Sequence, residues 1–178
     1  LSVFPVNTDI AAAEFARLVE RSGAVGVICE GRLRMMAERF GEIAELPELA
    51  GDMLLARARE DRPVQPGAGL LLQSSGTTGN ARIVWRSAAS LDWMARSLYE
   101  RIGFSPEDRM LTGMPLSHSY GGEHGVLAPA WGGASVHVCC GVQLPVIARE
   151  LRESGITILP GVPFLFEIMA SSSEHIPR

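Results

Sequence analysis

From about residue 70 onward, short apolar runs alternate with segments whose apolar residues recur at helical spacing. The strand candidates are residues 70–73, 82–86, 110–114, 134–139 and 156–159. The helix candidates are residues 89–102, 144–153 and 163–170. Strands that alternate with amphipathic helices are typical of α/β folds, in which crossover helices cover a mostly parallel sheet. We therefore expect an α/β fold with a largely parallel sheet and crossover helices.

The first 60 residues give a weaker pattern. A helix is expected over residues 9–21, with Thr8 as a plausible N-cap. Residues 24–29 form a short apolar run, which is typical of a buried strand. A second helix is expected over residues 32–40, whereas residues 42–61 fit neither pattern clearly.

Composition excludes several classes of protein. The chain has 178 residues, 20 acidic and 16 basic, and no basic stripe, so neither nucleic acid nor an anionic membrane surface is an expected partner. All the basic residues are arginine, which excludes a Schiff-base lysine or a Walker-type lysine within this chain. No apolar run approaches the roughly 18 residues of a membrane span. The three cysteines show no spaced pairs, so we expect a cytoplasmic protein rather than a disulfide framework.

The run Ser74–Asn80 (SSGTTGN) is the strongest local signal for chemistry, because none of its residues has a bulky side chain. Glycines let the backbone approach a ligand, and exposed amides and hydroxyls can donate to phosphate oxygens. Arg82 adds a permanent charge with a forked donor geometry. The run matches neither the GxxxxGK(S/T) nor the GxGxxG pattern. A flexible linker is the alternative, although the apolar strands on both sides argue against it.

Residues 71–82 (LLQSSGTTGNAR) resemble the phosphate-loop signature of the AMP-forming adenylating enzymes. That superfamily includes acyl- and aryl-CoA ligases, peptide-synthetase adenylation domains and luciferases. Residues 115–121 (PLSHSYG) are similar to the family's PLxHxxG segment, and residues 156–165 (ITILPGVPFL) to its strand, Val-Pro turn and helix. The chain departs from the signature at Ala81 and Arg82, where the family usually has proline and lysine. Arginine keeps the charge but changes the geometry of a phosphate contact.

The resemblance implies binding sites for ATP, Mg²⁺ and an acyl carboxylate. Residues 74–82 would form the phosphate loop, with Thr78 near Mg²⁺. His118 would act as the catalytic-site residue that orients the carboxylate or gates its pocket. The implied phosphate-binding residues are Ser74, Ser75, Gly76, Thr77, Thr78, Gly79 and Arg82.

The resemblance also implies a two-step activity. Members of this family join a carboxylic acid to the α-phosphate of ATP, and then pass the acyl group to a thiol of CoA or of an acyl carrier protein. Ser117 and His118 stand where peptide-synthetase domains usually carry Phe-Asp, which favours an acyl- or aryl-CoA ligase. Three alternatives stay open: an amino-acid adenylation domain, an unrelated α/β domain in which the SSGTTG segment is only a turn, and a non-catalytic nucleotide-binding or interaction remnant, for which Ala81 and Arg82 would be signs of drift.

Several parts of the family's machinery are missing between residues 1 and 178. The chain has no YGxTE-like segment, no later aspartate motif for the ribose, no hinge and no catalytic lysine. We therefore interpret residues 1–178 as a partial AMP-binding domain, with the C-terminal remainder and the small lid domain absent. We expect no adenylation turnover from this chain alone.

Other candidate residues have plainer explanations. His118, Glu123 and His124 are close in sequence, but glycines interrupt them and no helix is expected to hold them on one face, so we predict no zinc site. The adjacent Cys139 and Cys140 are expected to pack rather than to do redox chemistry. Tyr120 could line an acyl pocket or belong to the core. The three tryptophans are expected in the core.

Overall fold

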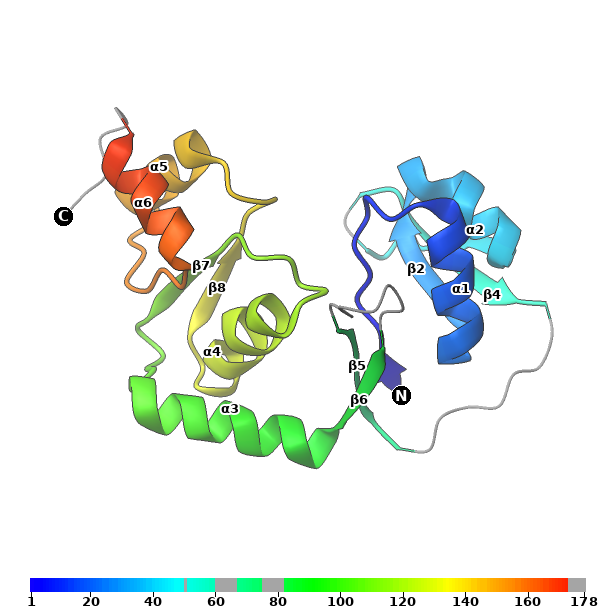
Figure 1. The fold of residues 1–178 in the computed structure, drawn as a ribbon, viewed down its shortest axis with the longest axis horizontal. Helices are drawn as coiled ribbons and strands as arrows, with labels where there is room; N and C mark the ends of the chain where they lie inside the picture. Colours follow the sequence, from blue (N-terminus) through cyan, green and yellow to red (C-terminus); the bar gives the residue numbers. More distant parts are fainter. Residues whose placement is uncertain (50, 60–66, 75–81, 173–178) are drawn as a thin grey trace. The chain divides into compact units, whose positions relative to one another are not determined.

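A computed structural model describes residues 1–49, 51–59, 67–74 and 82–172 of the chain (Figure 1). The chain divides into two compact units. Unit 1 comprises Leu1 and Thr8–Gly67, and unit 2 comprises Ser2–Asn7 and Ala68–Arg178. Both units combine helices with β-sheet, which confirms the α/β class. Within the described ranges, no helix is long and apolar enough to cross a membrane.

Unit 1 is a three-stranded antiparallel sheet with two helices. The strand order is β2 (Gly26–Glu30), β4 (Met53–Ala58) and β3 (Gly41–Glu45). The helical elements are α1 (Ala12–Ser22), the short η1 (Gly31–Leu33) and α2 (Arg34–Phe40). Leu54 and Ala56 of β4 are both buried, because alternate residues of a strand share one face. Leu18 of α1 and Ala37 of α2 are the other buried hydrophobic residues in the described part of unit 1.

Two expectations about unit 1 are wrong in detail. Helix α1 begins at Ala12 with Ala11 as its N-cap residue, so Thr8 does not cap it. Strand β2 is not buried: its residues alternate between exposed and half-buried, and Ile28 is 60% exposed. An antiparallel sheet can leave one face open, which a short apolar run alone does not reveal. The ambiguous stretch 42–61 contains most of β3 and all of β4.

Unit 2 contains a hairpin and a separate parallel pair. Strand β5 (Gly69–Gln73) pairs antiparallel with β6 (Ile83–Ser87) and parallel with β1 (Ser2–Val3). Strand β7 (Arg109–Thr112) pairs parallel with β8 (Ser135–Val138). Two of these three pairings are parallel, whereas the hairpin is antiparallel, as are both pairings of unit 1, so the sheets are mixed. Residues 74–82 are too few for a parallel crossover, which takes about a dozen residues or more.

The expected strand over residues 156–159 is reduced to a single parallel bridge between Ile158 and Met110. The remaining elements of unit 2 are helical. They are α3 (Ala88–Ile102), the π-helix η2 (Tyr120–Leu127), α4 (Ala128–Trp131), α5 (Leu144–Glu153) and α6 (Pro163–Ser171). The predicted helices 89–102, 144–153 and 163–170 therefore match α3, α5 and α6.

Strand β7 separates two clusters of buried side chains. Met110 belongs to one cluster with Ala95, Phe104 and Ala128. Its neighbour Leu111 belongs to the other cluster, whose remaining buried members are Ile147 and Leu165. Because successive side chains of a strand point to opposite faces, β7 is buried on both faces.

The tryptophans are not core residues. Trp85, Trp93 and Trp131 are all more than two-fifths exposed, and Trp93 reaches 71%. The indole N–H of Trp131 donates to Asp92 at 2.9 Å, and that of Trp85 donates to Ser2 Oγ at 3.4 Å. A large ring with one polar donor suits a partly exposed position of this kind.

Asp108 fastens the turn before β7 to the segment that bridges it. Its carboxylate accepts hydrogen bonds from Thr157 Oγ1 at 2.7 Å and from the amide and hydroxyl of Ser105 at 2.8 and 2.9 Å. The hydrogen bond from Thr157, followed by those from Ser105, holds the pKa of Asp108 below its ordinary value.

This lowered pKa predicts an acid-sensitive fold. A carboxyl group whose pKa is lowered by folding stabilises the protein above its unfolded pKa, near 4, and that stabilisation disappears as the pH falls through the folded value. We expect Asp108→Asn to lower the free energy of unfolding at neutral pH and to flatten its decline below about pH 4. Thr157→Val, which removes the principal donor, should act in the same direction. Urea unfolding at a series of pH values from neutral to acidic measures both variants. If the free energy of unfolding declined equally steeply with falling pH in the wild type and both variants, Asp108 would not be the source of the acid sensitivity.

Candidate phosphate-loop and carboxylate site

The hairpin β5–β6 holds the two ends of the predicted phosphate loop together. The amide of Ser74 donates to the carbonyl of Arg82 at 2.8 Å, and the amide of Arg82 donates to Ser74 Oγ at 3.2 Å. This pair continues the ladder one step beyond Gln73 and Ile83, the last paired residues of the strands. The side chain of Arg82 extends away from this closed base and is exposed to solvent.

Of the predicted phosphate-binding residues, Ser74 and Arg82 are thus brought together. The other five, Ser75, Gly76, Thr77, Thr78 and Gly79, lie outside the described residues. Their roles stay predictions. The buried strand before the loop is as expected, since Leu70, Leu71 and Leu72 are each at most 8% exposed.

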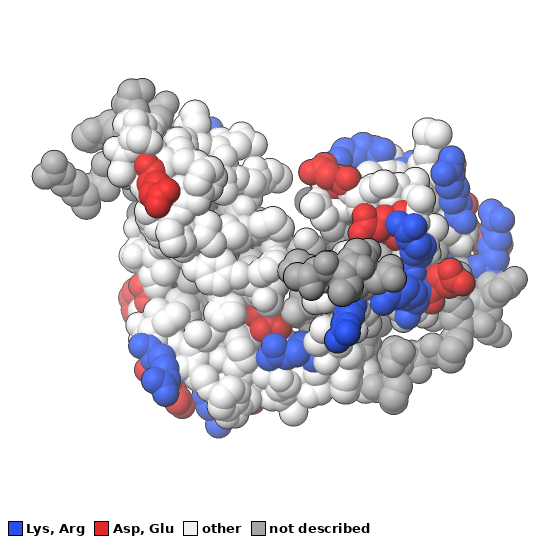
Figure 2. All heavy atoms as spheres, in the orientation of Figure 1, with Lys and Arg blue, Asp and Glu red and all other residues white. Residues whose placement is uncertain are grey.

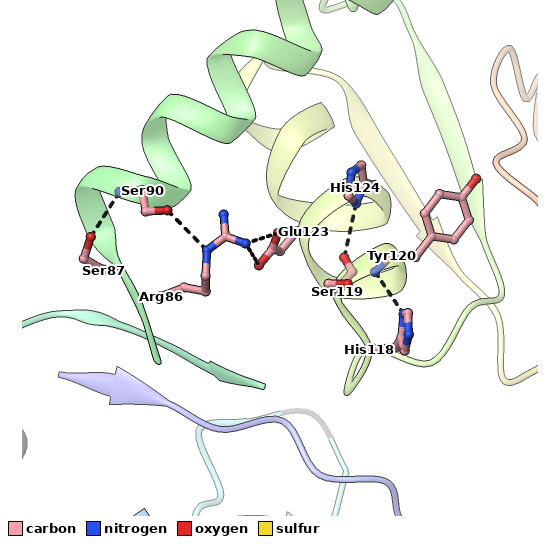
Figure 3. Close-up of polar contacts among 8 residues, drawn as sticks. All are labelled: Arg86, Ser87, Ser90, His118, Ser119, Tyr120, Glu123 and His124. Carbon is pink, nitrogen blue, oxygen red and sulfur yellow. Dashed lines mark hydrogen bonds and ion pairs between the residues drawn. The ribbon is translucent and has the colours of Figure 1, made fainter. Parts of the chain in front are cut away.

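His118 is exposed in a turn that follows β7, which agrees with its predicted position near the surface. Its backbone amide donates to the carbonyl of Pro115 at 3.0 Å, and its carbonyl accepts from the amide of Gly122 at 2.9 Å. Its ring Nδ1 accepts a hydrogen bond from the amide of Tyr120 at 3.2 Å (Figure 3). In the neutral ring, the proton is therefore on Nε2. This nitrogen can donate to a carboxylate.

The segment after His118 is helical rather than the glycine-rich loop that the sequence suggests. The π-helix η2 begins at Tyr120. Gly121 makes this possible, because a Cβ at this position would collide with the carbonyl oxygens of Pro115 and Met114. The glycine of the PLxHxxG pattern is thus needed where the chain folds back on its own backbone.

Tyr120 connects two of the motif blocks. Its hydroxyl donates to the carbonyl of Gly161 at 3.4 Å, and its ring lies 5.5 Å from the ring of His124. Tyr120 is half-buried, so it is neither a fully buried core residue nor an open surface one. The residues 115–121 and 156–165 are therefore joined directly within unit 2.

The sequence draws attention to Glu123 only as a candidate zinc ligand beside His118 and His124, and its partner in the structure is a different one. The side chain of Glu123 is 2% exposed, and both carboxylate oxygens lie 3.3 Å from Nη1 of Arg86 (Figure 3). It faces Arg86 rather than a metal position with His118 and His124. In the described parts of the chain, no group of three His, Cys, Asp or Glu side chains could hold a metal ion.

A cavity of about 370 Å³ lies elsewhere in unit 2, between β8 and α5. His137, Cys139 and Glu150 are among its lining residues, whereas Ser74, Arg82 and His118, the predicted site residues that the structure describes, are not. Cys139 also packs against the cluster of Leu111, as expected, and burial raises the pKa of its thiol, whereas Cys140 is exposed and the expectation that it packs is wrong. The hydrogen bond from Ser154 keeps the pKa of Glu150 below its ordinary value.

The fold is that of adenylate-forming enzymes. The structure has a TM-score of 0.75 with the ATP-bound crystal structure of MatB from Rhodopseudomonas palustris, at 19% sequence identity, over 96% of this chain and 36% of that one. Residues 1–177 match the family model described as AMP-binding enzyme. The chain belongs to this family.

Two curated relatives agree with this assignment. The chain is 30% identical over 142 residues to 4-coumarate–CoA ligase-like 4 of Oryza sativa subsp. japonica, covering 76% of this chain and 25% of the relative. It is also 30% identical over 130 residues to the salicylyl-CoA synthase / salicylate adenylyltransferase of Streptomyces sp, covering 68% and 23%. The chain therefore spans about a quarter of the length of these two relatives.

The close approach at Gly121 gives a prediction for stability. In a helix, alanine is normally preferred over glycine by about 0.5–1 kcal/mol. At Gly121 the added methyl group meets two backbone carbonyls, so we expect Gly121→Ala to destabilise the protein by about 1–3 kcal/mol. Urea unfolding measures the change.

Gly26→Ala is the matched control, because its added Cβ has no neighbour nearer than 3.5 Å. We expect this variant to be neutral or slightly stabilised. A Gly121→Ala protein at least as stable as the wild type would show that the segment 114–121 does not fold back as described.

Proposed function

We propose that the complete protein activates a carboxylic acid with ATP and transfers the acyl group to the thiol of CoA. The observation that carries this proposal is that unit 2 contains both the closed base of a phosphate-loop hairpin and the segment that carries His118, in a chain whose family binds AMP. The names of the relatives, a coumarate–CoA ligase-like protein and a salicylyl-CoA synthase, support an aromatic acid as the first substrate class to test.

The first step is an in-line attack of the carboxylate on the α-phosphate, which expels pyrophosphate. This step depends on positioning and on charge neutralisation more than on a base. In our proposal, residues 74–79 and Arg82 bind the β- and γ-phosphates, and the Arg82 fork neutralises charge on the leaving pyrophosphate. His118 donates from Nε2 to the acid's carboxylate and orients it.

In our proposal, Mg²⁺ arrives with ATP. Mg²⁺ typically takes one or two protein ligands and completes its shell with phosphate oxygens and water, so a three-residue cluster is not required. Thr78, the one protein ligand that we propose for it, lies outside the described residues. The ion would neutralise phosphate charge during the displacement.

One alternative is favoured by a specific observation. Ala81 and Arg82 depart from the family's usual proline and lysine, as a non-catalytic remnant of the family would. A remnant could bind nucleotide but would have no turnover. The amino-acid adenylation alternative is distinguished by its substrate, because it would respond to amino acids and to a carrier-protein thiol instead of CoA.

Carboxylate-dependent exchange of labelled pyrophosphate into ATP tests the proposal. We expect the complete gene product to catalyse exchange with salicylate, coumarate or another aryl acid. We expect the 178-residue chain alone to give none. Absence of exchange with aryl, alkyl and amino acids would favour the remnant, and exchange by the short chain would disprove our expectation for it.

Two substitutions separate the proposed roles. His118→Ala should lower exchange by about 10- to 100-fold, because the carboxylate loses an orienting donor. Arg82→Ala should weaken ATP use by a similar factor, and Arg82→Lys should recover part of it, because the charge remains. Arg101→Ala, which changes an exposed arginine in the last turn of α3, is the control and should leave exchange unchanged. Equal activity of the wild type and all four variants would remove both His118 and Arg82 from the site.

A further inference from the structure

Arg86 and Glu123 form the one described ion pair whose acidic partner is fully buried. The side chain of Glu123 is 2% exposed, and that of Arg86 is 31% exposed. Other pairs, such as Arg34 with Glu45, are exposed on both sides. Figure 2 shows acidic and basic side chains next to one another at the surface of the face in view. A single ion pair at such an exposed position contributes little stability.

A buried carboxylate is costly unless it is fully compensated, and Glu123 is compensated only in part. Arg86 Nη1 donates to Oε2, while Oε1, at the same distance of 3.3 Å, has no hydrogen-bond partner. Removing a carboxylate from water is often repaid incompletely by its partner, so a buried ion pair is weak evidence for stability. The pair therefore calls for an explanation beyond stability.

The pair connects the two segments that the proposed function needs. Arg86 lies on β6, the strand that begins at Ile83, directly after the closed loop base at Arg82. Its Nε donates to Ser90 Oγ at 3.2 Å, which fixes the guanidinium against the first turn of α3 (Figure 3).

Glu123 lies on η2, whose first residue holds the ring of His118. The amide of Tyr120 donates to His118 Nδ1, and the amide of Gly122 donates to the His118 carbonyl. Figure 3 shows Arg86 pointing toward Glu123, and His118 on the segment that leads into η2. Any displacement of η2 therefore moves the backbone amides that hold His118 in place.

We propose that Arg86 and Glu123 are positioning residues that fix His118 relative to the loop base formed by Ser74 and Arg82. This inference rests on the proposed function, because it assigns a role to the placement of the carboxylate-orienting imidazole relative to that base. Neither side chain contacts substrate in this proposal. The pair acts by fixing the position of η2 relative to β6. The carboxylate that His118 orients is thereby held next to the phosphates of ATP.

The test uses two readouts on matched variants. Glu123→Gln keeps the shape of the side chain and removes its charge, and Arg86→Lys keeps the charge and loses the fork. In the 178-residue chain, nitrogen chemical shifts of the His118 ring report the bond to Nδ1. We expect Glu123→Gln to weaken that signature and Arg86→Lys to retain most of it. In the complete protein, we expect Glu123→Gln to lower kcat for exchange by about 10-fold or more, with KM for ATP nearly unchanged.

A merely structural pair would give a different result. Glu123→Gln would then lower the melting temperature, but the folded variant would keep the wild-type His118 signature and kcat, and this would overturn the proposal. Glu45→Gln, which breaks an exposed pair, is the control and should change neither readout. If Glu123→Gln fails to fold, the apolar double variant Arg86→Met with Glu123→Met replaces it, because it leaves no buried charge without a partner. For this double variant too, a changed His118 signature and a lower kcat support the proposal, and wild-type values of both overturn it.

The two readouts also separate this proposal from the function on which it rests. If the wild-type complete protein shows no exchange, the proposed function fails. The ring signature in the short chain still reports whether the pair holds His118: an altered signature supports the coupling, and an unaltered one overturns it.

Discussion

The burial of β7 on both faces is the constraint on which unit 2 depends. Met110 and Leu111 enter opposite clusters, Thr112 is fully buried, and the strand's two edges are occupied by β8 and by Ile158. A strand packed on every side cannot shift without disturbing both clusters. The segment that carries His118 starts directly after this strand, so its origin is fixed by the core rather than by the loop itself.

The π-helix η2 follows this segment, and its stability depends on contacts with residues outside the helix. Three of its eight residues are glycine, which disfavours a helix by about 1 kcal/mol each relative to alanine. Gly121 lies against the carbonyls of Met114 and Pro115, and a Cβ at Gly125 would approach Thr112 Oγ1 to 2.6 Å. Close packing therefore takes the place of intrinsic helix preference in η2. π-helical turns are rare and occur frequently at functional sites.

The sequence predicts the elements whose signals are local. Helices α3 and α5 have clear apolar periodicity, and the strands around the loop are short apolar runs with turn residues beside them. It does not predict η2, because three glycines contradict a helix until the tertiary contacts are known. Nor does it predict the burial of Glu123, whose partner lies 37 residues away. A lone glutamate within a glycine-rich segment that follows a buried strand is the only signal that could have drawn attention to it.

Arg82 illustrates how a departure from a family pattern can be accommodated. Both backbone groups of Arg82 are tied to Ser74, so its side chain extends from a fixed anchor. A planar guanidinium on a fixed anchor loses less freedom on binding phosphate than it would on a loose one, and it offers two parallel donors. The pairing of Ser74 with Arg82 also closes the loop without the proline that the family usually has at position 81, whose contribution would be to reduce the freedom of the unfolded chain. In the function that we propose, backbone pairing at the hairpin base therefore fixes the arginine that replaces the lysine of the family pattern.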